Sequence, residues 1–163
     1  MIKVVKRVEC GGVEVENDPY IVLDVSWRVK ARADTLYLMV RGLEGGYVEL
    51  KVNSTDGALV ELIVIERPPE VDGFDNLPVS GSGQGCLTPA LDLDLWPWKI
   101  TPDYSEPAVK IARVESKLGM CIRAGVVTLM LSGADPVEFI GGGPVRVGIG
   151  QNGEMACVVA VLE

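Results

Sequence analysis

The stretch 48–65 reads VELKVNSTDGALVELIVI and carries the clearest structural signal in the chain. Its first part alternates Val48, Leu50 and Val52 with charged residues, which is the period of two expected of a strand with one buried face. A second apolar run occupies 59–65, and the step from Asp56 to Gly57 offers the positive φ that a tight turn requires. The stretch therefore predicts a β-hairpin.

The rest of the chain carries the same kind of signal. Runs rich in β-branched and aromatic residues predict further strands at 20–29, 35–40, 108–114, 121–131, 145–149 and 155–162. The last two runs flank Asn152 and Gly153 and predict a second hairpin. No long segment shows the 3.6-residue period of a helix. We expect one all-β domain over 1–163, an antiparallel β-sandwich or a barrel.

Two segments resemble each other. Residues 30–42 (KARADTLYLMVRG) and 121–133 (CIRAGVVTLMLSG) agree at five of thirteen positions. This similarity predicts two pseudo-repeated β-meanders, with repeat-like halves 1–66 and 91–163 that close on each other and bury both apolar faces. The Pro/Gly/Ser-rich segment 67–90 joins them, as a linker or as a long ordered loop.

Composition excludes several partners. The chain has a net charge of −8, from 15 basic and 23 acidic residues, which argues against nucleic acid. No apolar run is long enough to span a membrane, and the N-terminal sequence lacks the features of a secretory signal, so cytoplasmic residence is expected. Cys10, Cys86, Cys121 and Cys157 are far apart in sequence, and we expect buried free thiols.

Catalytic motifs are scarce. The chain contains no histidine, which removes the commonest general base and zinc ligand, and neither glycine-rich stretch is a P-loop. We therefore expect no catalytic site, no metal and no cofactor. The alternating run 91–95 (LDLDL) predicts a strand with Asp92 and Asp94 on one face, most simply a solvated face, although a carboxylate-dependent enzyme remains an alternative.

Negative charge and aromatic residues concentrate in one segment. Residues 66–107 hold eight acidic side chains against two basic ones, together with two tryptophans. Aromatic side chains anchor protein interfaces while carboxylates steer and pair with Lys or Arg, so the segment predicts a contact surface for a basic protein. Its candidate partner-binding residues are Asp72, Asp75, Asp92, Asp94, Trp96, Trp98, Asp103, Tyr104 and Glu106. The alternative is that the tryptophans close one end of the sandwich and the acids only solvate a loop.

The hairpin 48–65, with its alternating strand, turn and second apolar strand, resembles a pattern of small bacterial polymorphic-toxin immunity proteins. The resemblance implies a small acidic inhibitor that masks a basic toxin domain. The leading hypothesis is accordingly a non-enzymatic, immunity-type binding protein. A carbohydrate-binding β-module, in which Trp96, Trp98 and Tyr104 stack on a sugar, is a second possibility. Homodimerisation through an exposed sheet edge stays open.

Overall fold

The fold was analysed in a computed structural model that describes residues 1–30, 34–74, 85–100 and 109–162. The described chain is built from β-strands and one short 3₁₀ turn, η1 (Leu93–Leu95). The strands are β1 (Val4–Glu16), β2 (Asp24–Val29), β3 (Thr35–Gly42), β4 (Tyr47–Asn53), β5 (Leu59–Glu66), β6 (Cys86–Leu91), β7 (Lys99–Ile100), β8 (Lys110–Ser116), β9 (Gly119–Arg123), β10 (Val126–Met130), β11 (Pro136–Gly142), β12 (Val145–Gly150) and β13 (Met155–Val161).

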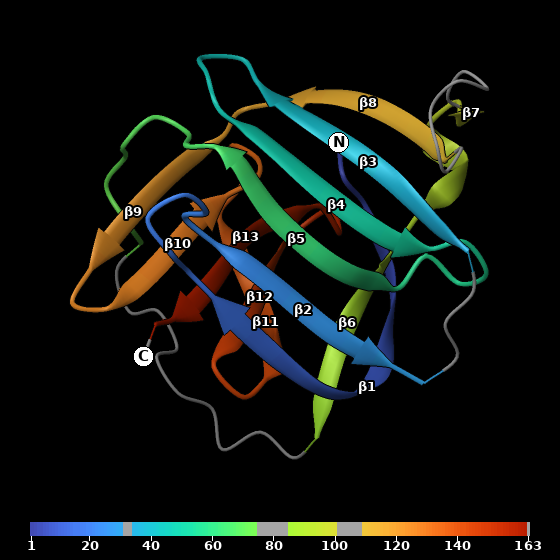
Figure 1. The fold of residues 1–163 in the computed structure, drawn as a ribbon, viewed down its shortest axis with the longest axis horizontal. Helices are drawn as coiled ribbons and strands as arrows, with labels where there is room; N and C mark the ends of the chain where they lie inside the picture. Colours follow the sequence, from blue (N-terminus) through green and yellow to red (C-terminus); the bar gives the residue numbers. More distant parts are fainter. Residues whose placement is uncertain (31–33, 75–84, 101–108, 163) are drawn as a thin grey trace.

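These strands form two sheets that lie one over the other in Figure 1. The larger sheet has the order β6-β1-β2-β5-β4-β3-β8-β7, and the smaller one has the order β11-β12-β13-β10-β9. All neighbours are antiparallel except β3 and β8, which run parallel. The all-β prediction is confirmed, and the two-sheet arrangement is that of a sandwich whose larger sheet is curled.

One apolar core fills the space between the sheets. Leu38, Leu50 and Leu62 of the larger sheet are fully buried, as are Leu129 and Val158 of the smaller one. These side chains belong to a single cluster, because each strand turns alternate residues inward. No helix in the described ranges is long and apolar enough to cross a membrane.

Contacts on two sides of the core connect the parts of the fold. Next to β9, the amide of Met120 donates to the carbonyl of Pro69 at 2.9 Å, and Val71 donates back to Met120 at 3.1 Å. On the far side, Arg7 of β1 forms an ion pair with Glu138 of β11. The segment after β5 therefore contacts β9, and β1 contacts β11.

Both predicted hairpins are present. Strands β4 and β5 meet at Gly57, where φ is +75°, and β12 and β13 meet at Gly153, where φ is +81°. A Cβ at Gly57 would also lie 2.3 Å from the carbonyl oxygen of Leu91, so both the turn and the close backbone approach require glycine. The predicted strand 121–131 is instead two strands, β9 and β10, because the chain turns at Ala124 with φ of 50°.

The predicted strand 91–95 is wrong. The structure ends β6 at Leu91 and forms η1 over the next residues. The carboxylate of Asp92 accepts a hydrogen bond from the amide of Asp94 at 3.1 Å. The Asp94 amide is therefore satisfied by a side chain, where in a β-strand it would donate to the carbonyl of a neighbouring strand. After Leu91, the alternating aspartates and leucines therefore form the 3₁₀ turn η1 with Asp92 as its N-cap.

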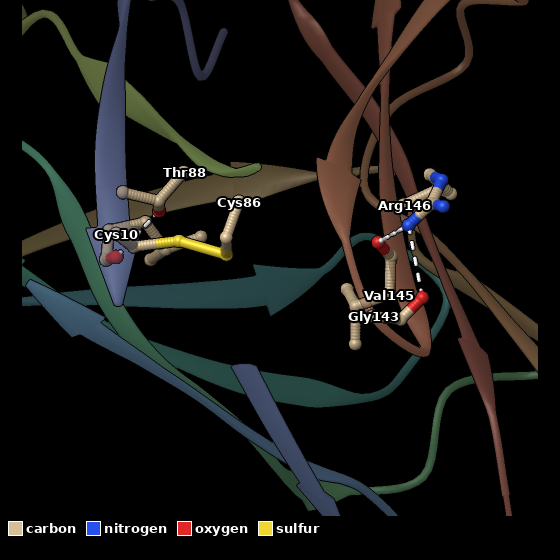
Figure 2. Close-up of a disulfide and its surroundings, with 7 residues drawn as sticks. Cys10, Cys86, Thr88, Gly143, Val145 and Arg146 are labelled. Atoms are coloured by element: carbon tan, nitrogen blue, oxygen red, sulfur yellow. Dashed lines mark hydrogen bonds between the residues drawn. A yellow bond between two sulfur atoms is a disulfide. The ribbon is translucent and has the colours of Figure 1, made fainter. Parts of the chain in front are cut away.

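The expectation of four free thiols is also wrong. Cys10 and Cys86 form a disulfide between β1 and β6, with their Cα atoms 5.2 Å apart. The two residues are direct partners in the antiparallel register, which brings together positions 76 residues apart in sequence. Cys121 and Cys157 are free and buried, as expected. Figure 2 shows the disulfide facing the turn between β11 and β12, where Arg146 donates to the carbonyls of Gly143 and Val145.

Four strands of each sheet follow the same order. Four strands of the larger sheet run β2-β5-β4-β3, and four of the smaller run β10-β13-β12-β11, each a Greek-key arrangement of consecutive strands. This order pairs β3 with β11, whereas the sequence similarity pairs residues 30–42 with 121–133, which hold β10. Strands β6, β7 and β8 also join the larger sheet, so the sheets do not follow the two sequence halves. Duplication therefore stays a hypothesis.

Candidate functional site

The structure separates the candidate residues of segment 66–107. Asp75, Asp103, Tyr104 and Glu106 lie outside the described residues. Asp72 is fully exposed, with its carboxylate 3.6 Å from the guanidinium of Arg123 on β9. The other described members belong to the stretch between β6 and β7, and β9 and β7 lie on opposite sides of the molecule in Figure 1. Asp72 and the pair of Asp92 and Asp94 are therefore not brought together.

The two tryptophans pack at one end of the fold. Their rings meet edge to face, with centroids 6.1 Å apart and planes at 84°. The indole Nε1 of Trp98 donates to the carbonyl of Leu93 at 2.9 Å, and both half-buried rings rest on the apolar core. Perpendicular rings do not form one flat stacking platform, so this arrangement favours a structural role for both side chains.

A second polar surface lies on the outside of the larger sheet. Strands β2, β5, β4, β3 and β8 point alternate side chains away from the core, and their register aligns these side chains in rows across the sheet. We call this surface the outer sheet face. Its residues include Asp24, Ser26, Arg28, Tyr37, Met39, Arg41, Tyr47, Glu49, Lys51, Glu61, Ile63, Ile111, Arg113 and Glu115.

A charge cluster occupies the middle of the outer sheet face. Lys51 lies between two carboxylates, with its Nζ 2.5 Å from Glu61 Oε2 and 3.8 Å from Glu49 Oε1. The side chains of Lys51 and Glu61 are only 22% and 20% exposed. The ammonium also lies 5.8 Å from the centroid of the Tyr37 ring. The ammonium of Lys51 thus interacts with two carboxylates and one aromatic ring.

Asp24 adds a third carboxylate to this charge cluster. Burial, the negative charges of Glu61 and Glu16 and a hydrogen-bond interaction with Glu61 together raise the pKa of Asp24 to about 6, against the lowering effect of Lys51. Its Oδ1 atom is buried and has no hydrogen-bond partner among the described residues. Burial likewise raises the pKa of Glu49, against the lowering effect of Lys51. The cluster therefore holds more negative charge than Lys51 compensates.

A groove of about 410 Å³ lies beside the charge cluster on the same face. It is lined by Met39, Arg41 and Tyr47 from β3 and β4, and by Arg113, Val114 and Glu115 from β8. Arg41 stands opposite Glu115 in the parallel register, and Met39 stands opposite Arg113. The outer sheet face is therefore acidic over β2 and β5 and carries two arginines over β3 and β8.

The make-up of this face is typical of a binding surface. Tyr, Met and Arg are enriched in protein interfaces, and here Tyr37, Tyr47, Met39, Arg41 and Arg113 lie on adjacent strands. Carboxylates with raised pKa values beside a groove are a further mark of functional sites. The described part of the chain has no group of acidic or cysteine side chains arranged to hold a metal ion.

Sequence reasoning identified part of this surface. The alternation in 48–52 placed Glu49 and Lys51 on the solvent side of a strand, and the structure confirms that placement. It did not reveal Asp24 as a neighbour, because β2 meets β5 only through the non-consecutive strand order. No family model and no curated protein matches this sequence.

Proposed function

We propose that this chain is a non-enzymatic protein-binding module that binds a basic partner through the acidic half of its outer sheet face. The observation that carries the proposal is the cluster of Asp24, Glu49 and Glu61 around the single cation of Lys51, beside the ring of Tyr37. Uncompensated carboxylates steer a cationic surface toward them, and a neighbouring aromatic ring supplies contact area.

The environment of Asp24 favours a basic partner. Its ionised form is costly in the free protein, because the carboxylate is desolvated and faces Glu61 and Glu16. A lysine or arginine of the partner placed near the Asp24 carboxylate would offset both costs. Binding is then expected to lower the pKa of Asp24 and to strengthen as pH rises through about 6.

This activity is that of an immunity-type inhibitor, in which an acidic protein without catalytic groups masks a basic toxin domain. The acidic segment 66–107 is proposed to add long-range attraction rather than the central contacts. Cytoplasmic residence is part of the same proposal. The disulfide between Cys10 and Cys86 is more typical of oxidising compartments, so cell fractionation is the direct check of location.

Site-specific photo-cross-linking in the native host tests this function. A benzophenone amino acid replaces Tyr37 on the outer sheet face, and a control chain carries it at Ile122, an exposed residue at the edge of the smaller sheet. Mass spectrometry identifies what each chain captures. We expect one basic protein from position 37 only. Equal capture from both positions, or an acidic protein from position 37, contradicts the proposal.

A carboxylate-dependent enzyme is a second candidate, and one observation favours it. Asp24 and Glu61 are neighbouring carboxyl groups, and the pKa of Asp24 is raised to about 6 by burial and by Glu61. Paired carboxyls of this kind can act as acid and base. However, Lys51 lies 2.5 Å from Glu61 and holds that carboxylate in an ion pair, which favours binding over catalysis.

A further inference from the structure

The groove beside the charge cluster is lined by two arginines. Two guanidinium groups flank it, Arg41 at the end of β3 and Arg113 in the middle of β8. Both side chains are exposed, and β3 and β8 are adjacent parallel strands. Two cationic side chains therefore line one groove on the outer sheet face.

Neither arginine is engaged by another of the described residues. In the described ranges, Arg7, Arg28 and Arg123 each form an ion pair with a carboxylate, and Arg146 donates to two backbone carbonyls. Over the same ranges Arg41 and Arg113 have no ion pair and no hydrogen bond, although Glu115 stands opposite Arg41. Their donors remain available to an external acceptor.

The charge and lining of the groove select the kind of acceptor. Two arginines against Glu115 leave an excess of one positive charge, which matches a single carboxylate better than a phosphate dianion. Met39 and Tyr47 provide apolar surface beside the cations, suited to the methylene groups of an acidic side chain. Guanidinium groups also pair with carboxylates through two parallel hydrogen bonds.

The position of the groove relates this acceptor to the proposed partner. Glu49, Met39 and Arg113 are consecutive partners in one cross-strand row. Adjacent strands are about 4.8 Å apart, so Glu49 of the charge cluster and Arg113 of the groove are about 10 Å apart along this row. A surface that offers a cation to the cluster can offer a carboxylate to the groove at the same time.

We propose that the Arg41–Arg113 groove binds an aspartate or glutamate side chain of the partner protein. The partner then presents a basic residue and an acidic residue about 10 Å apart, matching the acidic and basic halves of the outer sheet face. This inference rests on the proposed function, since it assigns the second half of the same contact surface. A protein that placed an acidic residue at the acidic half, or a basic residue at the groove, would be repelled, and this repulsion gives specificity.

The test uses the intact, disulfide-bonded chain and tetraglutamate peptide as the probe. Nuclear magnetic resonance follows the side-chain Nε signals of all arginines during titration. We expect saturable shifts at Arg41 and Arg113, and at least a tenfold rise in the dissociation constant in the R41Q/R113Q double variant. The matched control is R123Q, which removes an exposed arginine from β9 and is expected to bind as the wild type does.

Three outcomes overturn the assignment: no saturable shift at Arg41 and Arg113, equal shifts at Arg123, or tighter binding of inorganic phosphate than of tetraglutamate. Amide spectra of the double variant establish that it is folded. The peptide titration needs no partner, so it can succeed when cross-linking from position 37 fails. Conversely, a captured basic partner that binds R41Q/R113Q with unchanged affinity rejects the groove and leaves the proposed function standing.

Discussion

The Nζ atom of Lys51 lies 2.5 Å from Oε2 of Glu61, and the two residues are direct cross-strand partners on β4 and β5. Burial by itself lowers the pKa of Lys51, but the hydrogen bond and charge of Glu61, followed by the charge of Glu49, outweigh it and raise the pKa overall. Lys51 is thus the cation on which the outer sheet face depends.

Replacing Lys51 with methionine should destabilise the fold at neutral pH. The substitution leaves Asp24, Glu49 and Glu61 without their shared cation, and we expect a loss of about 1–2 kcal/mol at pH 7. The loss should shrink at pH 4, where Asp24 is protonated and no longer needs the cation. Urea unfolding at both pH values measures it, with K99M on β7 as a control for loss of a surface lysine. A loss of equal size at both pH values would show that packing, not charge, is responsible.

Asp24 should make the fold less stable as pH rises. Its folded pKa of about 6 lies above its unfolded value of 3.8, so the folded state binds the proton more tightly. The associated stability is fully present below the unfolded pKa and is lost as pH rises through about 6, at a cost of roughly 1 kcal/mol after allowance for solvent screening. Urea unfolding of D24N between pH 4 and 7 should lack this decline. D94N should retain it, and an unchanged decline in D24N would refute the assignment.

The Cys10–Cys86 disulfide should contribute strongly to stability. Its cysteines are 76 residues apart, and in the chain-entropy model a loop of that size corresponds to about 4.5 kcal/mol, although engineered disulfides often contribute less. We expect the C10A/C86A double variant to unfold with a free energy lower by about 2–4 kcal/mol. Addition of a reductant should destabilise the wild type and leave the variant unchanged. A wild type insensitive to reductant would mean that the bond does not form.

Trp98 distinguishes a structural role from a binding role at the tryptophan pair. The W98F variant loses the hydrogen bond to the Leu93 carbonyl and the edge of the indole ring, and we expect a loss of about 1 kcal/mol in unfolding free energy. Capture of the partner from position 37 should be unchanged. Loss of capture with unchanged stability would instead make Trp98 a contact residue.

Sequence patterns identified best the strands that have one buried face and one solvent-exposed face. In β4 and β5 the alternation is regular and the turn is marked by Gly57, so local sequence was enough. Strand β1 was missed because its register shifts between Cys10 and Val13, which breaks the period of two. Strand β6 follows a stretch rich in Gly and Ser and contains Pro89, a residue suited to an edge strand.

The candidate site was harder to predict for a different reason. Counting charges along the chain drew attention to the segment 66–107, because eight of its side chains are acidic. The cluster of Asp24, Glu49 and Glu61 is spread over 38 positions of sequence and forms only when β2 pairs with β5. The disulfide was missed for the same reason, since the pairing of β1 with β6 is a long-range contact.

Hydroxyl-radical footprinting of the chain with and without its captured partner tests the contact surface most directly. The method reads the solvent exposure of tyrosine, methionine and tryptophan side chains, which are present at both candidate surfaces. If the outer sheet face is the contact surface, Tyr37, Met39 and Tyr47 become protected on binding while Trp96 and Trp98 keep their reactivity. Protection of the two tryptophans with unchanged reactivity at Tyr37, Met39 and Tyr47 would contradict the account and return the contact surface to the acidic segment.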